Sequence, residues 1–389
     1  MIKIIATYGP SIKNENEEIT QKNILNLLES GVNIFRFNAS HGSNYEKKID
    51  IELIRKVAKN NNKNIKILYD TKGPEIRLGN FEKKIIFKKN KIIKMSFDKN
   101  LLCNDDEFSI YGDFDKNLLL ENIALNSSVY IDDGNLTLTV KFIDNDSLTL
   151  ECCNDWSSSN NKKVTFPGID FVSENVSERD KEDIIFACSE KCEYIALSFL
   201  TKIEQLNNFK KIILDNKYHP FLIGKIENYT AMKNIDSLIE NCDSIMVARG
   251  DLATETSYEL IPEYQNIIVE KCLIAKKPVI IATEILASCE RNLRPTRAEV
   301  TDAYFAITSD VDALMLSGET ANGVDPINAV KILKTIIDKY DKPYSETKGI
   351  DEVNFEILKS NRNIFYILEK IDLKKENKYF LYKNIESNF

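Results

Sequence analysis

Short apolar segments alternate with amphipathic helical stretches along most of this chain of 389 residues. Eight of the segments are almost continuously apolar, which is typical of strands buried on both faces. They lie at 2–6, 33–37, 65–69, 194–197, 221–226, 244–248, 279–282 and 313–316. The helical stretches include 20–30, 178–189, 203–214, 259–275 and 297–307. Eight buried strands that alternate with helices predict an α/β fold of the (β/α)8 TIM barrel type.

The alternation is interrupted after the third strand signal. Residues 79–167 are rich in Lys, Asn, Asp and Ser, and 136–140 and 148–151 show the period-two alternation of half-buried strands. The sequence Asp-Asp-Gly-Asn at 132–135 is typical of a hairpin turn. We therefore predict a small β domain at 79–167, inserted after the third strand of a barrel formed by 1–78 and 168–342.

Two charged or polar stretches are interpreted as structural segments rather than as binding sites. The Lys-rich run 83–94 predicts two strands with a solvated charged face and inward Ile and Phe, rather than an anion-binding patch. Residues 343–389 form a short extension after the barrel pattern, with a helix expected over 352–371.

Composition excludes several classes of protein. The formal net charge of -8 disfavours a nucleic-acid partner. The sequence contains no run of 18 apolar residues, so no membrane span is predicted. The eight Cys are scattered and only two His are present, so a His/Cys metal site is not expected. The N-terminal apolar run is too short for a signal peptide. We expect reduced thiols in a cytoplasmic protein.

Polar residues follow the predicted strands with unusual regularity. In a β/α barrel the active site lies at the carboxyl ends of the strands, so these residues are expected to meet at one mouth. They are Arg36, Asn38, Ser40, Asp70, Thr71, Lys72, Ser198, Lys225, Glu227, Arg249, Gly250, Asp251, Thr283, Glu284, Ser317 and Glu319.

The residue types at these strand ends restrict the chemistry. Glu227 and Asp251 follow adjacent strands and suit Mg²⁺ or Mn²⁺ completed by water and substrate oxygens. Arg36 and Lys225 suit a phosphate held at that metal, and Gly250 allows backbone N–H groups to approach an anion. The set therefore predicts phosphoryl transfer or enolate chemistry on a phosphorylated anion.

A second group offers oxygen ligands without a positive charge. Such oxygens suit a monovalent cation. The group consists of Asn38, Ser40, Asp70 and Thr71.

Ten segments of the chain resemble the pyruvate kinase family, in the family's order and spacing over nearly all of 1–342. They are TYGPS (7–11), NIFRFNASHG (33–42), DTKGPEIR (70–77), IDDG (131–134), FPG (166–168), SF (198–199), KIEN (225–228), IMVARGDL (245–252), RPTRAE (294–299) and MLSGET (315–320). DTKGPEIR, MVARGDL and MLSGET together are highly specific. The family's barrel with an inserted β domain agrees with the organisation inferred above.

The resemblance implies transfer of the phosphoryl group of phosphoenolpyruvate to ADP, which gives pyruvate and ATP in the last step of glycolysis. It implies a phosphotransferase that requires Mg²⁺ or Mn²⁺ and K⁺. Its implied catalytic residues are Lys225, Thr283 and Arg36. Substrate would also contact Ser198, Gly250 and Asp251, while Glu227 and Asp251 hold the divalent metal.

The resemblance also implies a nucleotide site and a potassium site. The nucleotide residues would be Thr7, Pro10, Asn38, His41, Arg77 and Lys163, with Asp133 closing from the inserted domain. The K⁺ ligands would be Asn38, Ser40, Asp70 and Thr71, and Glu75 matches the potassium-dependent branch. Members of the family carry a larger C-terminal regulatory domain. Here we expect no allostery through such a domain, and a homodimer through barrel helices remains open.

Departures from the family pattern keep two alternatives open. Ala253 replaces a Gly, Glu284 a Gln, Leu293 a Pro and Asn322 a Lys. Because Glu284 and Asn322 alter the acceptor side, one alternative is a phosphotransferase with another acceptor, or a metal-dependent lyase that forms a pyruvate enolate. Ala253 and the shortened C-terminus motivate the other, a catalytically weak pseudokinase that senses metabolites.

Overall fold

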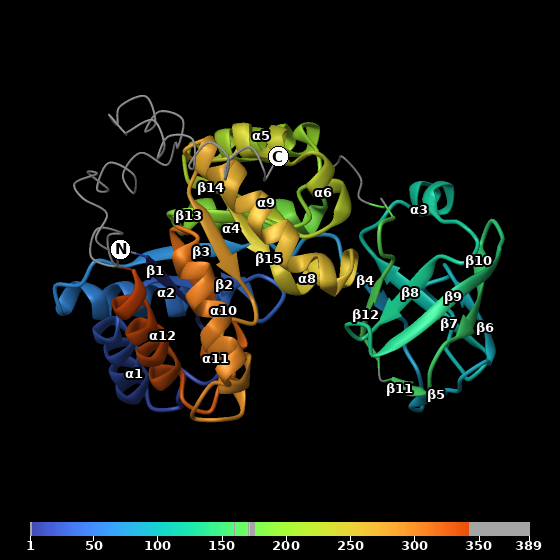
Figure 1. Ribbon diagram of the computed structural model, residues 1–389, viewed down its shortest axis with the longest axis horizontal. Helices are drawn as coiled ribbons and strands as arrows, with labels where there is room; N and C mark the ends of the chain where they lie inside the picture. Colours follow the sequence, from blue (N-terminus) through green and yellow to red (C-terminus); the bar gives the residue numbers. More distant parts are fainter. Residues whose placement is uncertain (1, 159, 170, 172–175, 342–389) are drawn as a thin grey trace, which may run out of the picture.

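The computed structural model describes residues 2–158, 160–169, 171 and 176–341 (Figure 1). Eight parallel strands close into a barrel in the order β1-β17-β16-β15-β14-β13-β3-β2. Their bounds are β1 Lys3–Thr7, β2 Val32–Asn38, β3 Lys66–Asp70, β13 Tyr194–Leu197, β14 Phe221–Ile226, β15 Ser244–Ala248, β16 Val279–Ala282 and β17 Ala313–Leu316. These bounds lie within one residue of the predicted segments.

Helices cover the outside of the barrel. They are α1 Glu17–Ser30, α2 Asn44–Asn60, α4 Glu178–Ser189, α5 Ile203–Asp215, α6 Tyr229–Lys233, α7 Ile235–Asn241, α8 Arg249–Glu255, α9 Ile261–Ile274, α10 Arg297–Thr308, α11 Gly318–Ala321 and α12 Pro326–Tyr340. Short 3₁₀ turns cover Tyr258–Leu260 and Ala287–Glu290. Helix α1 begins earlier than predicted because the Asn16 side chain caps it by accepting from Glu18 N–H.

The barrel strands are apolar throughout because both of their faces are buried. One set of side chains packs outward against the helices, and another fills the barrel interior. The interior set includes Ile5, Leu68, Ala196, Ile223, Met246, Ile280 and Met315. Successive side chains of one strand therefore belong to different clusters: Ile4 and Ala6 pack outward, and Ile5 between them fills the interior.

The chain between β3 and α4 forms a second closed barrel, drawn in green and teal beside α8 in Figure 1. Its strands run in the order β10-β6-β7-β4-β12-β8-β9. They are β4 Ile76–Leu78, β6 Ile92–Ser96, β7 Glu107–Gly112, β8 Ser128–Ile131, β9 Leu136–Ile143, β10 Ser147–Cys152 and β12 Lys163–Thr165. Strands β5 Ile85–Phe87 and β11 Trp156–Ser158 form a small additional sheet, and α3 covers Lys116–Asn122. We call this unit, residues 76–165, the inserted domain.

The arrangement confirms the predicted (β/α)8 barrel with a small β domain inserted after the third strand. The hairpin predicted at 132–135 connects β8 and β9, and Asp132 and Asp133 both have positive φ, as the preferred hairpin turns require. In the Lys-rich run, Ile85, Phe87 and Ile93 point inward.

Several lysines of that run are paired with acidic residues. Lys88 pairs with Asp155, and Lys94 pairs with Glu107. This agrees with a solvated charged face. The helix expected over 352–371 lies outside the described residues. Within the described part, no helix combines the length and the apolar character needed to cross a membrane.

Candidate active site

The predicted strand-end residues gather at the carboxyl end of the barrel. Parallel pairing places Asn38, at the end of β2, opposite Asp70, at the end of β3. Arg36 lies two residues before Asn38, so its side chain points to the same face of β2. Lys225 lies near the end of β14, two residues before Glu227. The topology therefore brings together residues separated by up to about half of the chain.

Asp70 is the central anion of this mouth. Its side chain is completely buried and accepts a hydrogen bond of 2.7 Å from Arg36 Nε, and its Oδ1 lies 3.0 Å from Lys225 Nζ. Burial would raise the pKa of Asp70, but the two cations, Lys225 first, lower it below its usual range. A buried carboxylate with two cationic partners stays ionised, and it holds both cations toward the barrel mouth.

Lys225 makes three polar contacts within 3.0 Å. Its Nζ lies 2.8 Å from Glu227 Oε1 and donates to Ser198 Oγ at 2.7 Å, besides the contact with Asp70. Burial would lower the pKa of Lys225, but the carboxylates of Asp70 and Glu227 raise it above its ordinary value. Lys225 is therefore an ammonium cation at neutral pH and suits stabilisation of negative charge rather than proton abstraction.

Glu227 and Asp251 form the anionic pair of the site. Burial raises the pKa of Glu227 and the Asp251 carboxylate adds to this, although Lys225 opposes it. Burial would also raise the pKa of Asp251, but Lys163 and then Lys225 lower it. The two carboxylates thus lie close enough to repel each other, and a cation between them would relieve that repulsion.

The donor set fits a hard divalent cation. No group of three His, Cys, Asp or Glu side chains in the described part of the chain is arranged to hold a metal. A cation at Glu227 and Asp251 would therefore have two protein carboxylates and would take its remaining ligands from water or substrate, as Mg²⁺ does in many phosphate-transferring sites. The Lys163 ammonium already contacts Asp251, which shows that a cation can be placed there.

The inserted domain contributes two cations to the mouth. Lys163 and Arg77 are directly opposite each other on the antiparallel strands β12 and β4. Lys163 forms an ion pair with Asp251 of the barrel, and Arg77 binds Glu75 Oε2 through Nη2 at 2.9 Å. Like charges directly opposite each other destabilise a sheet unless anions compensate them. This pair is therefore suited to an anionic ligand.

Thr283 follows β16 in an unusual conformation. Its φ is 67°, and the next residue, Glu284, has a φ of 53°, which is rare for residues other than Gly. Thr283 Oγ1 accepts a 2.8 Å hydrogen bond from Gly250 N–H and donates to Ala282 O. A Cβ on Gly250 would make only an ordinary contact with Thr283, so the protein alone does not require Gly there. Because such strain is concentrated at functional sites, it agrees with the role predicted for Thr283.

The four predicted potassium ligands lie at neighbouring strand ends. Asn38 Oδ1 accepts from Ser40 N–H at 3.0 Å, and Thr71 O accepts from Ser198 Oγ at 2.7 Å. Asp70 supplies the carboxylate. Neutral carbonyl, amide and hydroxyl oxygens beside one carboxylate fit a monovalent cation of low charge density. The assignment remains a prediction.

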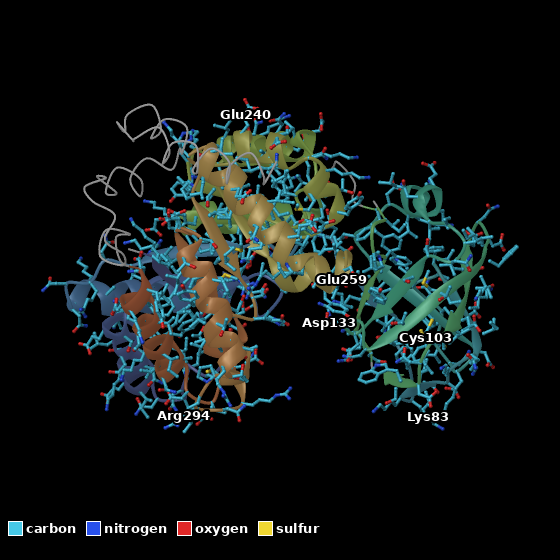
Figure 2. All side chains as sticks on the ribbon, viewed as in Figure 1. Lys83, Cys103, Asp133, Glu240, Glu259 and Arg294 are labelled. Carbon is cyan, nitrogen blue, oxygen red and sulfur yellow. The ribbon has the colours of Figure 1, made fainter. Side chains whose placement is uncertain are left out.

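The remaining predicted nucleotide residues differ in exposure. Pro10 and His41 are exposed near the mouth, so His41 is not a buried structural histidine. Thr7 is buried, and its Oγ1 donates to Leu316 O at 2.8 Å and accepts from Arg36 Nη1 at 3.1 Å. In this arrangement Thr7 orients Arg36. Figure 2 labels Asp133 at the side of the inserted domain nearest the barrel.

Three of the departures from the family pattern can be placed in the structure. Ala253 lies inside α8 and is absent from the residues with positive φ, so its Cβ causes no strain among the described elements. Asn322 is exposed after α11. Glu284 is exposed as well, and its backbone carbonyl accepts from Arg249.

Sequence reasoning placed Arg249 at the mouth without a partner, and it missed Glu255. Arg249 holds Thr283 O at 2.8 Å and Asp302 at 2.8 Å, which fixes the strained turn after β16. Glu255 is buried on α8, and burial raises its pKa to about 8, although Lys163 opposes the rise. Its backbone oxygen accepts from Gly168 N–H. Arg249 stood in the quoted MVARGDL segment, but only the tertiary structure shows its partners.

Comparisons with known proteins agree with one another. The family model described as pyruvate kinase, barrel domain, matches residues 1–330. A pyruvate kinase of Mycoplasma genitalium is 36% identical over 382 residues, which cover 93% of this chain and 74% of that protein. A pyruvate kinase of Staphylococcus epidermidis is 38% identical over 337 residues, which cover 86% of this chain and 56% of that protein.

A solved structure has the same fold. The crystal structure of a pyruvate kinase from Cryptosporidium parvum superimposes with a TM-score of 0.81 and 34% sequence identity. The match covers 87% of this chain and 69% of that one. The chain thus spans about half to three-quarters of the length of these relatives.

Proposed function

We propose the following function from the fact that the chain belongs to the pyruvate kinase family. It is a phosphotransferase that transfers the phosphoryl group of phosphoenolpyruvate to ADP, giving pyruvate and ATP. One observation carries the proposal for this chain: the buried cluster of Asp70, Arg36, Lys225 and Glu227 lies next to Asp251, which the inserted domain reaches through Lys163. Cations and a carboxylate pair at one mouth suit a substrate that carries both a phosphoryl group and a carboxylate.

Arg36 and Lys225 act on the phosphoryl group. Each is oriented by Asp70, so neither has to be ordered when the substrate binds. Lys225 remains positively charged in the cluster and stabilises negative charge that develops on the transferring phosphoryl group and on the enolate oxygen. Ser198, which bonds Lys225, keeps the ammonium at this position.

Glu227 and Asp251 would hold Mg²⁺ or Mn²⁺. When bound, the divalent cation supplies charge neutralisation for the substrate's carboxylate and phosphoryl oxygens. The residues of this chain place two carboxylates for it and leave its other positions open. Gly250 N–H donates to Thr283 Oγ1, so a substrate carboxylate that accepts from it would lie beside that hydroxyl and share the donor.

Thr283 is the proposed group at the enolate. Its hydroxyl is fixed between Gly250 N–H and Ala282 O, and the turn that carries it is held by Arg249. A positioned hydroxyl can pass a proton to the enolate carbon through the polar chain that it belongs to. Proton delivery after phosphoryl transfer then gives pyruvate.

The nucleotide would bind between the barrel and the inserted domain. Arg77 and Lys163 present paired cations from the inserted domain, while Pro10 and His41 are exposed on the barrel. Phosphate groups of ADP would replace the carboxylates that now compensate these cations. Asn38, Ser40, Asp70 and Thr71 would bind K⁺ beside this site.

Two further proposals concern the environment of the protein. Among the described residues all eight Cys are free thiols, seven of them buried, which supports a cytoplasmic location. Phe305 on α10 is 59% exposed, next to Tyr304. This apolar surface supports a homodimer through barrel helices.

The test is pyruvate formation from phosphoenolpyruvate and ADP by the purified chain with Mg²⁺, in K⁺ and again in a K⁺-free buffer. We expect turnover that depends on K⁺. Turnover that is indifferent to K⁺ would retain the kinase and remove the potassium site. Folded protein that binds phosphoenolpyruvate but makes no pyruvate would indicate another acceptor or a metabolite sensor.

A further inference from the structure

Phe199 lies two residues after the end of β13 and is only 4% exposed. Its φ of 52° places a bulky residue in the left-handed region, which such residues rarely adopt. A strained backbone of this kind persists only where contacts on several sides hold it, and it is concentrated at functional sites. The contacts of Phe199 connect parts of the molecule that are otherwise separate.

The backbone of Phe199 holds one ligand of the proposed metal site. Its N–H donates to Glu227 Oε2 at 2.5 Å, while Glu227 Oε1 lies 2.8 Å from Lys225 Nζ. The first contact fixes the orientation of the carboxylate from the side opposite the ammonium. Hydrogen bonds of this kind orient metal-binding carboxylates, and their loss weakens metal affinity.

The ring of Phe199 packs into the core of the inserted domain, although its backbone is part of the barrel. It is part of the apolar cluster that forms the core of the inserted domain, together with Phe166 and Phe171. Lys163 Nζ lies 5.5 Å from the ring centroid, within the range of cation–π contacts. Behind the ring, a Cβ on Gly73 would come within 2.9 Å of it, so the glycine leaves the space that the ring fills.

We propose that Phe199 is a positioning residue that couples docking of the inserted domain to the orientation of the Glu227 carboxylate. The inference rests on the proposed function, in which Glu227 holds the divalent cation. When the inserted domain is docked, its core surrounds the ring and keeps the backbone in the strained conformation. That conformation aims the N–H at Glu227. When the domain moves away, the backbone can relax and the carboxylate loses its fixed orientation.

The test measures Mn²⁺ binding without any substrate, by counting free Mn²⁺ with electron paramagnetic resonance. The parent protein for this experiment is the full chain with unaltered sequence, because Lys163 joins the inserted domain to the barrel through Asp251 and its competition with the metal is the same in every variant. Phe199→Leu is added to the parent. The matched control is Phe108→Leu, which alters a fully buried ring in the same cluster that packs against Phe87 inside the inserted domain.

We expect Phe199→Leu to weaken Mn²⁺ binding about ten-fold, the effect typical of losing an outer contact to a metal ligand. Phe108→Leu should lower the melting temperature but change the Mn²⁺ dissociation constant less than about two-fold. Phe199→Met has the same expected effect and replaces Phe199→Leu if that variant does not fold.

The proposal is overturned if the Phe199 variant binds Mn²⁺ as the parent does, or if the control weakens binding equally. Failure of the proposed function is a separate result. A chain with unaltered sequence that binds Mn²⁺ but makes no pyruvate would refute the reaction, while the Mn²⁺ constants would still decide the role of Phe199.

Discussion

Lys163 of the inserted domain forms an ion pair with Asp251 of the barrel, 88 residues further along the chain. Asp251 is also one of the two proposed ligands of the divalent cation. The same carboxylate therefore has two cationic partners that compete for it, one from the protein and one from solution. This competition makes Lys163 the most direct probe of how the two domains cooperate.

Replacing Lys163 with Met should act in opposite directions on nucleotide and metal. The variant loses a phosphate-binding cation, so we expect the KM for ADP to rise about ten-fold, equivalent to a charged hydrogen bond. Mn²⁺ binding without nucleotide should become tighter, because Asp251 is no longer paired. Lys162→Met is the matched control, since Lys162 pairs with Asp132 within the inserted domain. Equal effects in both variants would contradict the assignment.

Replacing Lys225 with Met should abolish phosphoryl transfer. We expect kcat to fall at least about a thousand-fold, because the charge that stabilises the transferring group is lost. The free energy of unfolding should also fall by about 3 kcal/mol, since Asp70 loses one of its two buried cationic partners. Steady-state kinetics and urea unfolding measure the two effects. Retained turnover in the variant would show that Lys225 has another role.

Asp180 predicts a pH dependence of stability that is separate from the metal site. This buried carboxyl lies in the first turn of α4 and accepts from Gly73 N–H at 2.9 Å and from the hydroxyl of the N-cap residue Ser177 at 3.0 Å. Burial raises its pKa to about 6 from 3.8, and the hydrogen bonds from Gly73 and Ser177 oppose the rise. Because the folded state binds the proton more tightly, this group contributes a penalty that grows as pH rises from about 4 to about 6 and then stays constant.

The variant Asp180→Asn cannot ionise, so it lacks this penalty. Its free energy of unfolding relative to the unaltered chain should therefore rise by about 1–3 kcal/mol between pH 4 and pH 7. Urea unfolding at both pH values measures the difference. The exposed Asp215→Asn should show no such change. A constant difference between Asp180→Asn and the unaltered chain would refute the perturbed carboxyl.

Asn322 stands where the family pattern has Lys, and it is exposed after α11. Introducing Asn322→Lys should lower the KM for the nucleotide about three- to ten-fold, the worth of one added phosphate contact. The KM for phosphoenolpyruvate should barely change. Val324→Lys, at a position 57% exposed two residues away, controls for the added charge. An identical response to both substitutions would mean that long-range attraction, and not a contact, is responsible.

Much of the fold was predictable because barrel strands are buried on both faces and therefore read as continuous apolar runs. The predicted segments match β13 to β17 residue for residue. The predicted start of the helix 259–275 was less accurate. A 3₁₀ turn covers Tyr258–Leu260, and α9 starts only at Ile261. Helix ends depend on local capping and on Pro262, which periodicity does not register.

The candidate site was predictable for a similar reason. Carboxyl ends of parallel strands must meet at one mouth, so residues such as Arg36, Asp70 and Lys225 could be grouped from their order alone. Their roles remain predictions, but their proximity follows from the strand order.

Partners across the chain were decided only by tertiary structure. Sequence order could not show that Asp70 serves both Arg36 and Lys225, that Arg249 holds the turn at Thr283, or that the ring of Phe199 enters the core of the inserted domain. Hydrophobic periodicity is a local property and determines which faces are buried. Side-chain contacts between distant segments depend instead on register, docking and packing, which exist only once the chain has folded.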